Sequence, residues 1–235
     1  MLLDARKKAF DLDHAVPWGR SRADYCAFFD LGDLPRNARI LDCAAGPSSF
    51  TAESTRLGWD VTAVDPLYRH SADEIARRIE AEVPRQVESL QRARDRFVWG
   101  RYGTPEKLAE MRLAAMRAFL DDYREAAGSG RYLAAGLPIL PFHERRFDLA
   151  LCSHFLFLYS HLFDAAFHIV AIAQLLRAAR EVRIFPLLDL DGAPSAHLGP
   201  LRQALAARGA ESEIRLVPYE FQRGGDRMLR ILAPP

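Results

Sequence analysis

Asp42 and Asp65 each lie at the end of a short apolar run, and they are 23 residues apart. The turn after Asp42 holds Gly46, and a glycine can adopt the positive φ that lets the backbone approach a ligand closely. A carboxylate about 20 residues beyond such a turn can accept hydrogen bonds from the two hydroxyls of a ribose. The pattern therefore predicts a site for a nucleotide-type ligand, although each aspartate could instead cap a turn or a helix.

The composition of that turn narrows the kind of ligand. A fold that binds a dinucleotide needs the pattern Gly-x-Gly-x-x-Gly, whose glycines admit a pyrophosphate. Residues 44–49 contain a single glycine and Pro47, and the chain has no phosphate-binding Gly-Lys-Ser/Thr motif. A ligand with a ribose but no phosphate, such as S-adenosylmethionine, therefore fits better than a nicotinamide dinucleotide.

The hydrophobic pattern predicts the elements that position these residues. Residues 38–43 and 59–65 have the pattern of buried strands and flank a helix at 50–57, which together make a parallel βαβ unit. Further strands are expected near residues 131–134, 147–152, 180–185, 213–217 and 228–232, with helices at 165–179 and 201–207. Residues 67–131 are far more than a crossover needs, so they predict a helical insertion or lid. Residues 1–33 are expected to be a helical lead-in to one domain that spans residues 1–235.

The run ILDCAAGPS at residues 40–48 resembles the acidic-x-Gly-x-Gly-x-Gly signature of class I S-adenosylmethionine-dependent methyltransferases. Asp65, the phrase LPF at 140–142, the strand phrase FDLALCSH at 147–154 and a terminal hairpin follow in the family's order. The resemblance covers about residues 35–232 apart from 67–131. Residues 153–160 and 218–224 are similar to a small bacterial subgroup of unassigned substrate. The resemblance implies a Rossmann-like three-layer α/β sandwich with a mostly parallel seven-stranded sheet and an antiparallel C-terminal hairpin strand.

Two departures from the family's pattern affect the expected site. Ala44 and Ser48 stand where the first and third glycines of the signature would be, so Gly46 alone is expected to adopt positive φ. Residues 135–138 (AGLP) replace an aspartate that often binds the adenine amino group in the family. Adenine is therefore expected to meet backbone and apolar contacts.

The resemblance implies a set of residues that bind S-adenosylmethionine. They are Trp18, Arg20, Asp42, Ala44, Gly46, Asp65, Pro66, Leu67, Leu137 and Ser153. Arg20 could bind the methionine carboxylate of the cofactor, since a guanidinium holds a carboxylate with two hydrogen bonds. It could equally be a surface arginine.

His154 and Tyr159 are the predicted catalytic residues, because the loop after the fourth strand faces the donor methyl group in this family. Histidine titrates near neutral pH and suits removal of a proton from an attacking hydroxyl, amine or thiol. Tyr159 offers a phenol that could orient the acceptor. His154 could instead be a core residue, and an amine or thiolate needs no base when positioning supplies the acceleration.

The bulk composition favours a small-molecule acceptor. With 32 Lys and Arg against 31 Asp and Glu, the chain lacks the basic excess of a dedicated nucleic-acid binder. Its three cysteines are scattered among apolar residues and indicate neither disulfides nor a metal site. No signal or membrane-spanning run is seen, so we expect a cytoplasmic monomer or homodimer. The alternatives are a methyltransferase of protein or RNA and a non-catalytic protein that binds S-adenosylmethionine.

Overall fold

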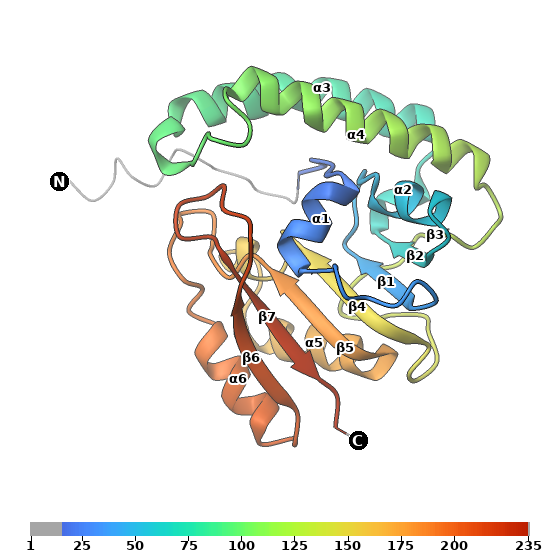
Figure 1. The fold of residues 1–235 in the computed structure, drawn as a ribbon, viewed down its shortest axis with the longest axis vertical. Helices are drawn as coiled ribbons and strands as arrows, with labels where there is room; N and C mark the ends of the chain where they lie inside the picture. Colours follow the sequence, from blue (N-terminus) through green and yellow to red (C-terminus); the bar gives the residue numbers. More distant parts are fainter. Residues whose placement is uncertain (1–15, 235) are drawn as a thin grey trace.

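The computed structural model describes residues 16–234 and contains one seven-stranded sheet in the order β3-β2-β1-β4-β5-β7-β6 (Figure 1). The strands are β1 (Arg39–Cys43), β2 (Asp60–Val64), β3 (Tyr132–Leu133), β4 (Phe147–Ser153), β5 (Ala179–Phe185), β6 (Glu211–Leu216) and β7 (Arg227–Leu232). The first five are parallel, and β7 runs antiparallel between β5 and β6. This topology confirms the predicted Rossmann-like fold with its antiparallel C-terminal hairpin strand.

Helices cover both faces of the sheet and make the predicted three-layer sandwich. They are α1 (Arg22–Phe29) and α2 (Phe50–Arg56) on one face, and α5 (Ala165–Ala178) and α6 (Leu198–Ala206) on the other. In Figure 1, α1 lies in front of the sheet and α5 behind it. Side chains alternate along β1, so Ile40 packs in the cluster of α1 while Leu41 packs in the cluster of α5. None of the helices within residues 16–234 combines the length and apolar composition that crossing a membrane requires.

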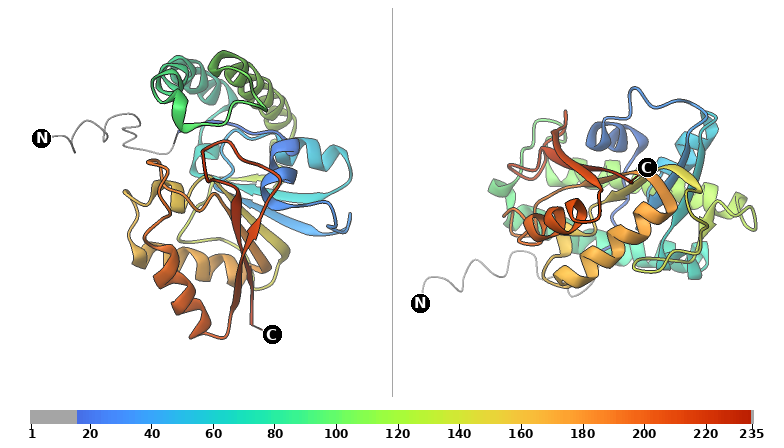
Figure 2. Two further views of the ribbon diagram at one scale, coloured as in Figure 1. Left: turned by 60° about the vertical axis from the view of Figure 1, so that its left-hand side comes forward. Right: turned by 90° about the horizontal axis from the view of Figure 1, so that it is seen from below.

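The predicted helical insertion is a pair of long helices, α3 (Ala72–Arg92) and α4 (Pro105–Glu125). They run side by side across one end of the sheet (Figures 1 and 2). Each begins at a hydroxyl cap, where Ser71 accepts from the Glu74 amide and Thr104 from the Lys107 amide. The insertion therefore lies over the end of the sheet where a ligand would bind.

The segment before α1 crosses the sheet end as an extended strap. The predicted helical lead-in at residues 1–33 contains helix α1, but this N-terminal strap, residues 16–21, is not helical. Residues 1–15 of the lead-in lie outside the described residues. The Ser49 amide and the Ser48 hydroxyl both donate to the Arg20 carbonyl. A Cβ on Gly19 would lie only 2.2 Å from the Pro47 carbonyl oxygen, so a glycine is needed where the strap passes the β1–α2 turn.

The loop of the β6–β7 hairpin reaches up to the α3–α4 connection, as Figure 1 shows. The Val98 amide donates to the Phe221 carbonyl at 2.7 Å, and the Arg223 amide donates to the Arg96 carbonyl at 3.0 Å. The rings of Phe97 and Phe221 stack with centroids 4.6 Å apart. The C-terminal hairpin and the insertion, far apart in the sequence, therefore close one side of the sheet end together.

Candidate functional site

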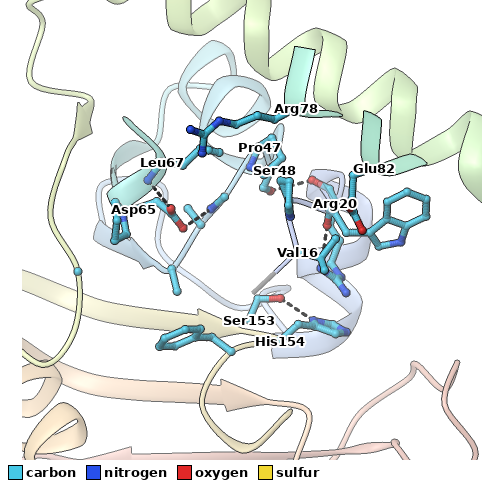
Figure 3. A pocket seen from close by; sticks show the side chains of 18 of the residues that line it. Val16, Arg20, Pro47, Ser48, Asp65, Leu67, Arg78, Glu82, Ser153 and His154 are labelled. Carbon is cyan, nitrogen blue, oxygen red and sulfur yellow. Dashed lines mark hydrogen bonds between the residues drawn. The ribbon is translucent and has the colours of Figure 1, made fainter. Parts of the chain in front are cut away.

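A cavity of about 480 Å³ opens at the carboxyl ends of the parallel strands. Ala44, Asp65 and Ser153, which end or follow β1, β2 and β4, contribute to its floor, and α3 passes over it (Figure 3). This is the edge where doubly wound sheets bind their ligands, and the volume lies in the ordinary range of about 300–1,000 Å³ for ligand pockets. We refer to this cavity as the cleft.

Two residues of the β1–α2 turn adopt left-handed backbone conformations. Gly46 has φ +54°, as predicted, but Ala44 has φ +55°, so the expectation that Gly46 alone would adopt positive φ is wrong. The turn is held from the next strand, since the Gly46 amide donates to the Asp65 carboxylate and the Ala45 amide to the Val64 carbonyl. These bonds offset the cost of order 1 kcal/mol that alanine bears in this conformation.

The Asp65 carboxylate faces the cleft and joins two loops. Its Oδ2 accepts from the Gly46 amide at 2.9 Å, and its Oδ1 accepts from the Leu67 amide at 2.8 Å (Figure 3). Burial raises the pKa of Asp65, and the two backbone hydrogen bonds oppose that rise. A carboxylate oxygen has two lone pairs, so each oxygen can still accept from a ligand hydroxyl.

Asp42 is the predicted site residue that does not line the cleft. It points to the α1 face of β1, where it is fully buried and Tyr25 Oη donates to its Oδ1 at 3.1 Å. Burial, with a smaller contribution from the Asp65 charge, raises the pKa of Asp42 well above its ordinary value. Successive side chains of a strand point to opposite faces of the sheet. The Asp42 carboxyl therefore lies on the α1 face of β1 and not in the cleft.

Arg20 lies across the cleft from Asp65 (Figure 3). Its Nη1 donates to the Trp18 carbonyl at 2.9 Å, its buried Nε has no partner, and no described carboxylate lies within ion-pair distance of it. Burial first, and then the nearby Arg112 guanidinium, lower the pKa of Arg20 to about 10. A half-buried cation in this state favours a bound anion such as a carboxylate.

His154 follows β4 at the edge of the cleft and has φ +51°. Its Nδ1 shares a hydrogen bond of 2.8 Å with the Ser153 hydroxyl (Figure 3). Burial, followed by the charges of Arg20 and Arg112, lowers the pKa of His154 well below 6.5, so the imidazole is neutral at neutral pH. Tyr159 is nearby and accepts from the Val16 amide at 3.1 Å, which leaves the phenol proton free to be donated.

Apart from Asp42, the structure brings all the predicted cofactor-binding and catalytic residues together around the cleft. The sequence reasoning missed Tyr25 on α1 and the pair Arg78 and Glu82 on α3, which also line it. The Glu82 side chain is only 12 % exposed and accepts from Gln86 Nε2 at 2.8 Å. The available signal was the spacing of polar residues four apart along α3, which puts Arg78, Glu82 and Gln86 on one helical face.

The fold and the cleft define a Rossmann-like α/β protein with a ligand-sized site at the carboxyl ends of its strands. The sequence is 31% identical over 222 residues to the uncharacterized protein MJ0045 of Methanocaldococcus jannaschii, an alignment that covers 94% of this chain and 97% of that protein. The chain belongs to the family of this archaeal protein. No family model matches the sequence.

Solved structures with some likeness to this chain include several methyltransferases. Magnesium protoporphyrin IX methyltransferase of Synechocystis PCC 6803 with bound SAM has a TM-score of 0.45 and 14% identity, covering 86% of this chain and 72% of that one. A TehB-like SAM-dependent methyltransferase of Corynebacterium glutamicum has a TM-score of 0.46 and 16% identity, covering 91% and 85%. The 1,6-didemethyltoxoflavin-N1-methyltransferase of Burkholderia thailandensis has a TM-score of 0.44 and 16% identity, covering 91% and 76%. Likeness at this level carries no functional argument, so the function must come from the site.

Proposed function

We propose that this protein is an S-adenosylmethionine-dependent methyltransferase with a small-molecule acceptor. The observation that carries the proposal is the pair of groups on opposite sides of the cleft. Asp65 presents a carboxylate with free lone pairs, and Arg20 presents a guanidinium that has no carboxylate partner within residues 16–234. A ligand with a ribose at one end and an amino-acid carboxylate at the other matches both.

The remaining cleft residues fit the same ligand. Pro66, Leu67 and Leu137 give apolar surface beside Asp65, where adenine would lie. Ala44, Gly46 and Ser153 bring backbone close to where the methionine part would pass, between Asp65 and Arg20. Trp18 stands next to Arg20 in the N-terminal strap and would cover that part.

The bound cofactor would supply an electrophilic methyl carbon. The oxygen, nitrogen or sulfur atom of the acceptor would donate an electron pair to that carbon, and the bond from the carbon to the cofactor's sulfur would break with its electrons going to that sulfur. The acceptor atom would also release its proton. The chain's task is to hold the acceptor in line and to exclude water. His154 and Tyr159 lie at the edge of the cleft where they can receive that proton and orient the acceptor. Open space also adjoins the cleft beside His154, which supports an enzyme over a non-catalytic binder.

Binding of S-adenosylhomocysteine, measured by isothermal titration calorimetry, tests the assignment. Asp65→Ala is expected to weaken binding about 10- to 150-fold, the equivalent of about 1.5–3 kcal/mol for hydrogen bonds to a charged group. Asp60→Ala, an exposed aspartate at the opposite end of β2, should bind like wild type. Wild-type protein that does not bind S-adenosylhomocysteine would overturn the proposed function.

We also propose that the insertion and the N-terminal strap act as a lid. Arg78 and Glu82 of α3 and Trp18 of the strap line the cleft from above, so a bound ligand would contact both segments. Hydrogen exchange should then slow in residues 16–20 and in the first half of α3 when S-adenosylhomocysteine is added. The amides of β7, which lie away from the cleft, serve as the internal control. Equal exchange rates with and without ligand in both segments would contradict the lid.

A further inference from the structure

A second, smaller cavity of about 120 Å³ adjoins the cleft. The two cavities share Val16, Trp18, Arg20, His154 and Tyr159. This second cavity, which we call the chamber, therefore adjoins the cleft at His154, the proposed proton acceptor. It extends from there under α3 and α4 to the β6–β7 loop. Its position beside His154 makes it the space in which a methyl acceptor would lie.

Aromatic rings form much of the chamber's wall. Phe97 and Phe221 stack at 4.6 Å, and Phe185 and Tyr219 meet edge to face at 5.7 Å. For comparison, an apolar protein cavity of about 150 Å³ binds benzene. At about 120 Å³ the chamber is smaller than that cavity, so it limits a ligand to a single ring, and its ring walls favour an aromatic one.

The polar part of the chamber is cationic. Arg20 and Arg112 line it, and no carboxylate is among the lining residues in the described part of the chain. Arg112 is only 2 % exposed, and its Nε has no hydrogen-bond partner among the residues that the structure describes. Its charge is only partly compensated, because the Asp24 carboxylate behind it also pairs with Arg101 at 3.5 Å.

The amide side chains around the chamber carry no charge. Gln86 of α3 donates to Glu82 in the cleft, and Gln222 donates to the Asp189 carbonyl at 2.8 Å. Within the described residues, Asp24 is shared by Arg112 and Arg101, and Glu82, a carboxylate on the cleft side, does not line the chamber. Desolvated positive charge in excess stabilises an anionic ligand and disfavours a cationic one.

We propose that this chamber is the acceptor subsite and that the acceptor is a single-ring aromatic carboxylate. The ring lies among the phenylalanines, and the carboxylate accepts from Arg112 Nε, the one guanidinium nitrogen of Arg112 without a partner among the described residues. Arg20 remains with the cofactor's carboxylate at the junction. The acceptor role rests on the proposed function, whereas the selectivity of the chamber for an aromatic anion depends only on its own walls and charges.

Calorimetric titration of two isosteric probes tests the inference. The probes are 4-hydroxybenzoate and its neutral counterpart 4-hydroxybenzamide. Each is added to wild-type protein with and without saturating S-adenosylhomocysteine. The acid is expected to bind about tenfold or more tightly than the amide, because hydrogen bonds to charged groups are worth more than neutral ones. This comparison needs no variant and is unaffected by folding. Equal binding of acid and amide, or binding of neither, would overturn the inference.

A chamber-filling variant locates the binding. Leu158 lines the chamber and not the cleft, so Leu158→Trp should abolish binding of 4-hydroxybenzoate while S-adenosylhomocysteine binds as before. Leu162→Trp, at an exposed leucine one turn away that lines neither cavity, is the matched control and should bind both ligands normally. Unchanged binding of the acid to Leu158→Trp would exclude the chamber. Selective binding of the acid without any binding of S-adenosylhomocysteine would support the ligand class and overturn the proposed function instead.

Discussion

Replacement of Asp24 by alanine is expected to lower the free energy of unfolding by about 3–5 kcal/mol, the usual result of leaving a buried charge without its partner. Asp24 is 3 % exposed, and Arg112, its main partner, is 2 % exposed. The Tyr102 hydroxyl donates to the same carboxylate at 2.9 Å. Without Asp24, the Arg112 and Arg20 charges would repel each other in a desolvated space.

Chemical denaturation of wild type, Asp24→Ala and two further variants measures this effect. Asp73→Ala removes an exposed pair with Arg124 at 3.0 Å, and such a pair contributes only about 0–1 kcal/mol. The double variant Asp24→Ala/Arg112→Met should recover part of the lost stability, because it removes both buried charges. A cost below about 1 kcal/mol for Asp24→Ala would show that the buried pair does not hold α1 to α4.

The same pair predicts how stability depends on pH. Burial alone would raise the pKa of Asp24, but Arg112 and the hydrogen bonds from Tyr102 and Ser21 outweigh burial and lower it below 3.8. A depressed folded-state pKa gives stability that is present above about pH 3.8 and is lost as the pH falls through the folded value. The stability difference between wild type and Asp24→Ala should therefore narrow only below about pH 3.8.

Replacement of His154 by alanine is expected to lower kcat by about 10²–10⁴, the usual contribution of general-base catalysis, once an acceptor is identified. Affinity for S-adenosylhomocysteine should stay near wild type, because His154 is proposed to act on the acceptor. His143→Ala is the matched control, since His143 is exposed and lines neither cavity. A loss of less than about threefold would show that His154 is a packing residue.

The pH profile gives a second readout of the same proposal. A base must be unprotonated, and the pKa of His154 lies well below 6.5 because of burial and then the charges of Arg20 and Arg112. The kcat/KM of wild type should therefore be flat near neutrality and fall only as the pH drops well below 6.5. This fall in kcat/KM at low pH should be absent in His154→Ala. A fall that begins at or above pH 6.5 and occurs at the same pH in His154→Ala would show that another group titrates.

Local patterns in the sequence were enough to predict most of the fold. Apolar runs of strand length separated by helical periods predicted the parallel sheet and the insertion, because both periodicities depend on near neighbours in the chain. Asp65 was found for the same reason, since parallel strands bring their carboxyl ends to one edge. The positive φ of Ala44 was not predicted, because hydrogen bonds to the neighbouring strand hold the turn in this conformation. The conformational preference of alanine gives no information about such bonds.

Only the tertiary structure decided which charges are buried and what they face. The sequence left Arg20 open between a ligand contact and a surface residue. Packing of the N-terminal strap against the β1–α2 turn half-buries it, and no carboxylate in the described part of the chain pairs with it. Nothing in the sequence marked Arg112 as special, yet it is buried against Asp24, which is 88 positions away. The chamber likewise joins Phe97 to Phe221 across more than half of the chain. Burial and charge balance are sums over neighbours in space, so they exist only once the distant segments have packed together.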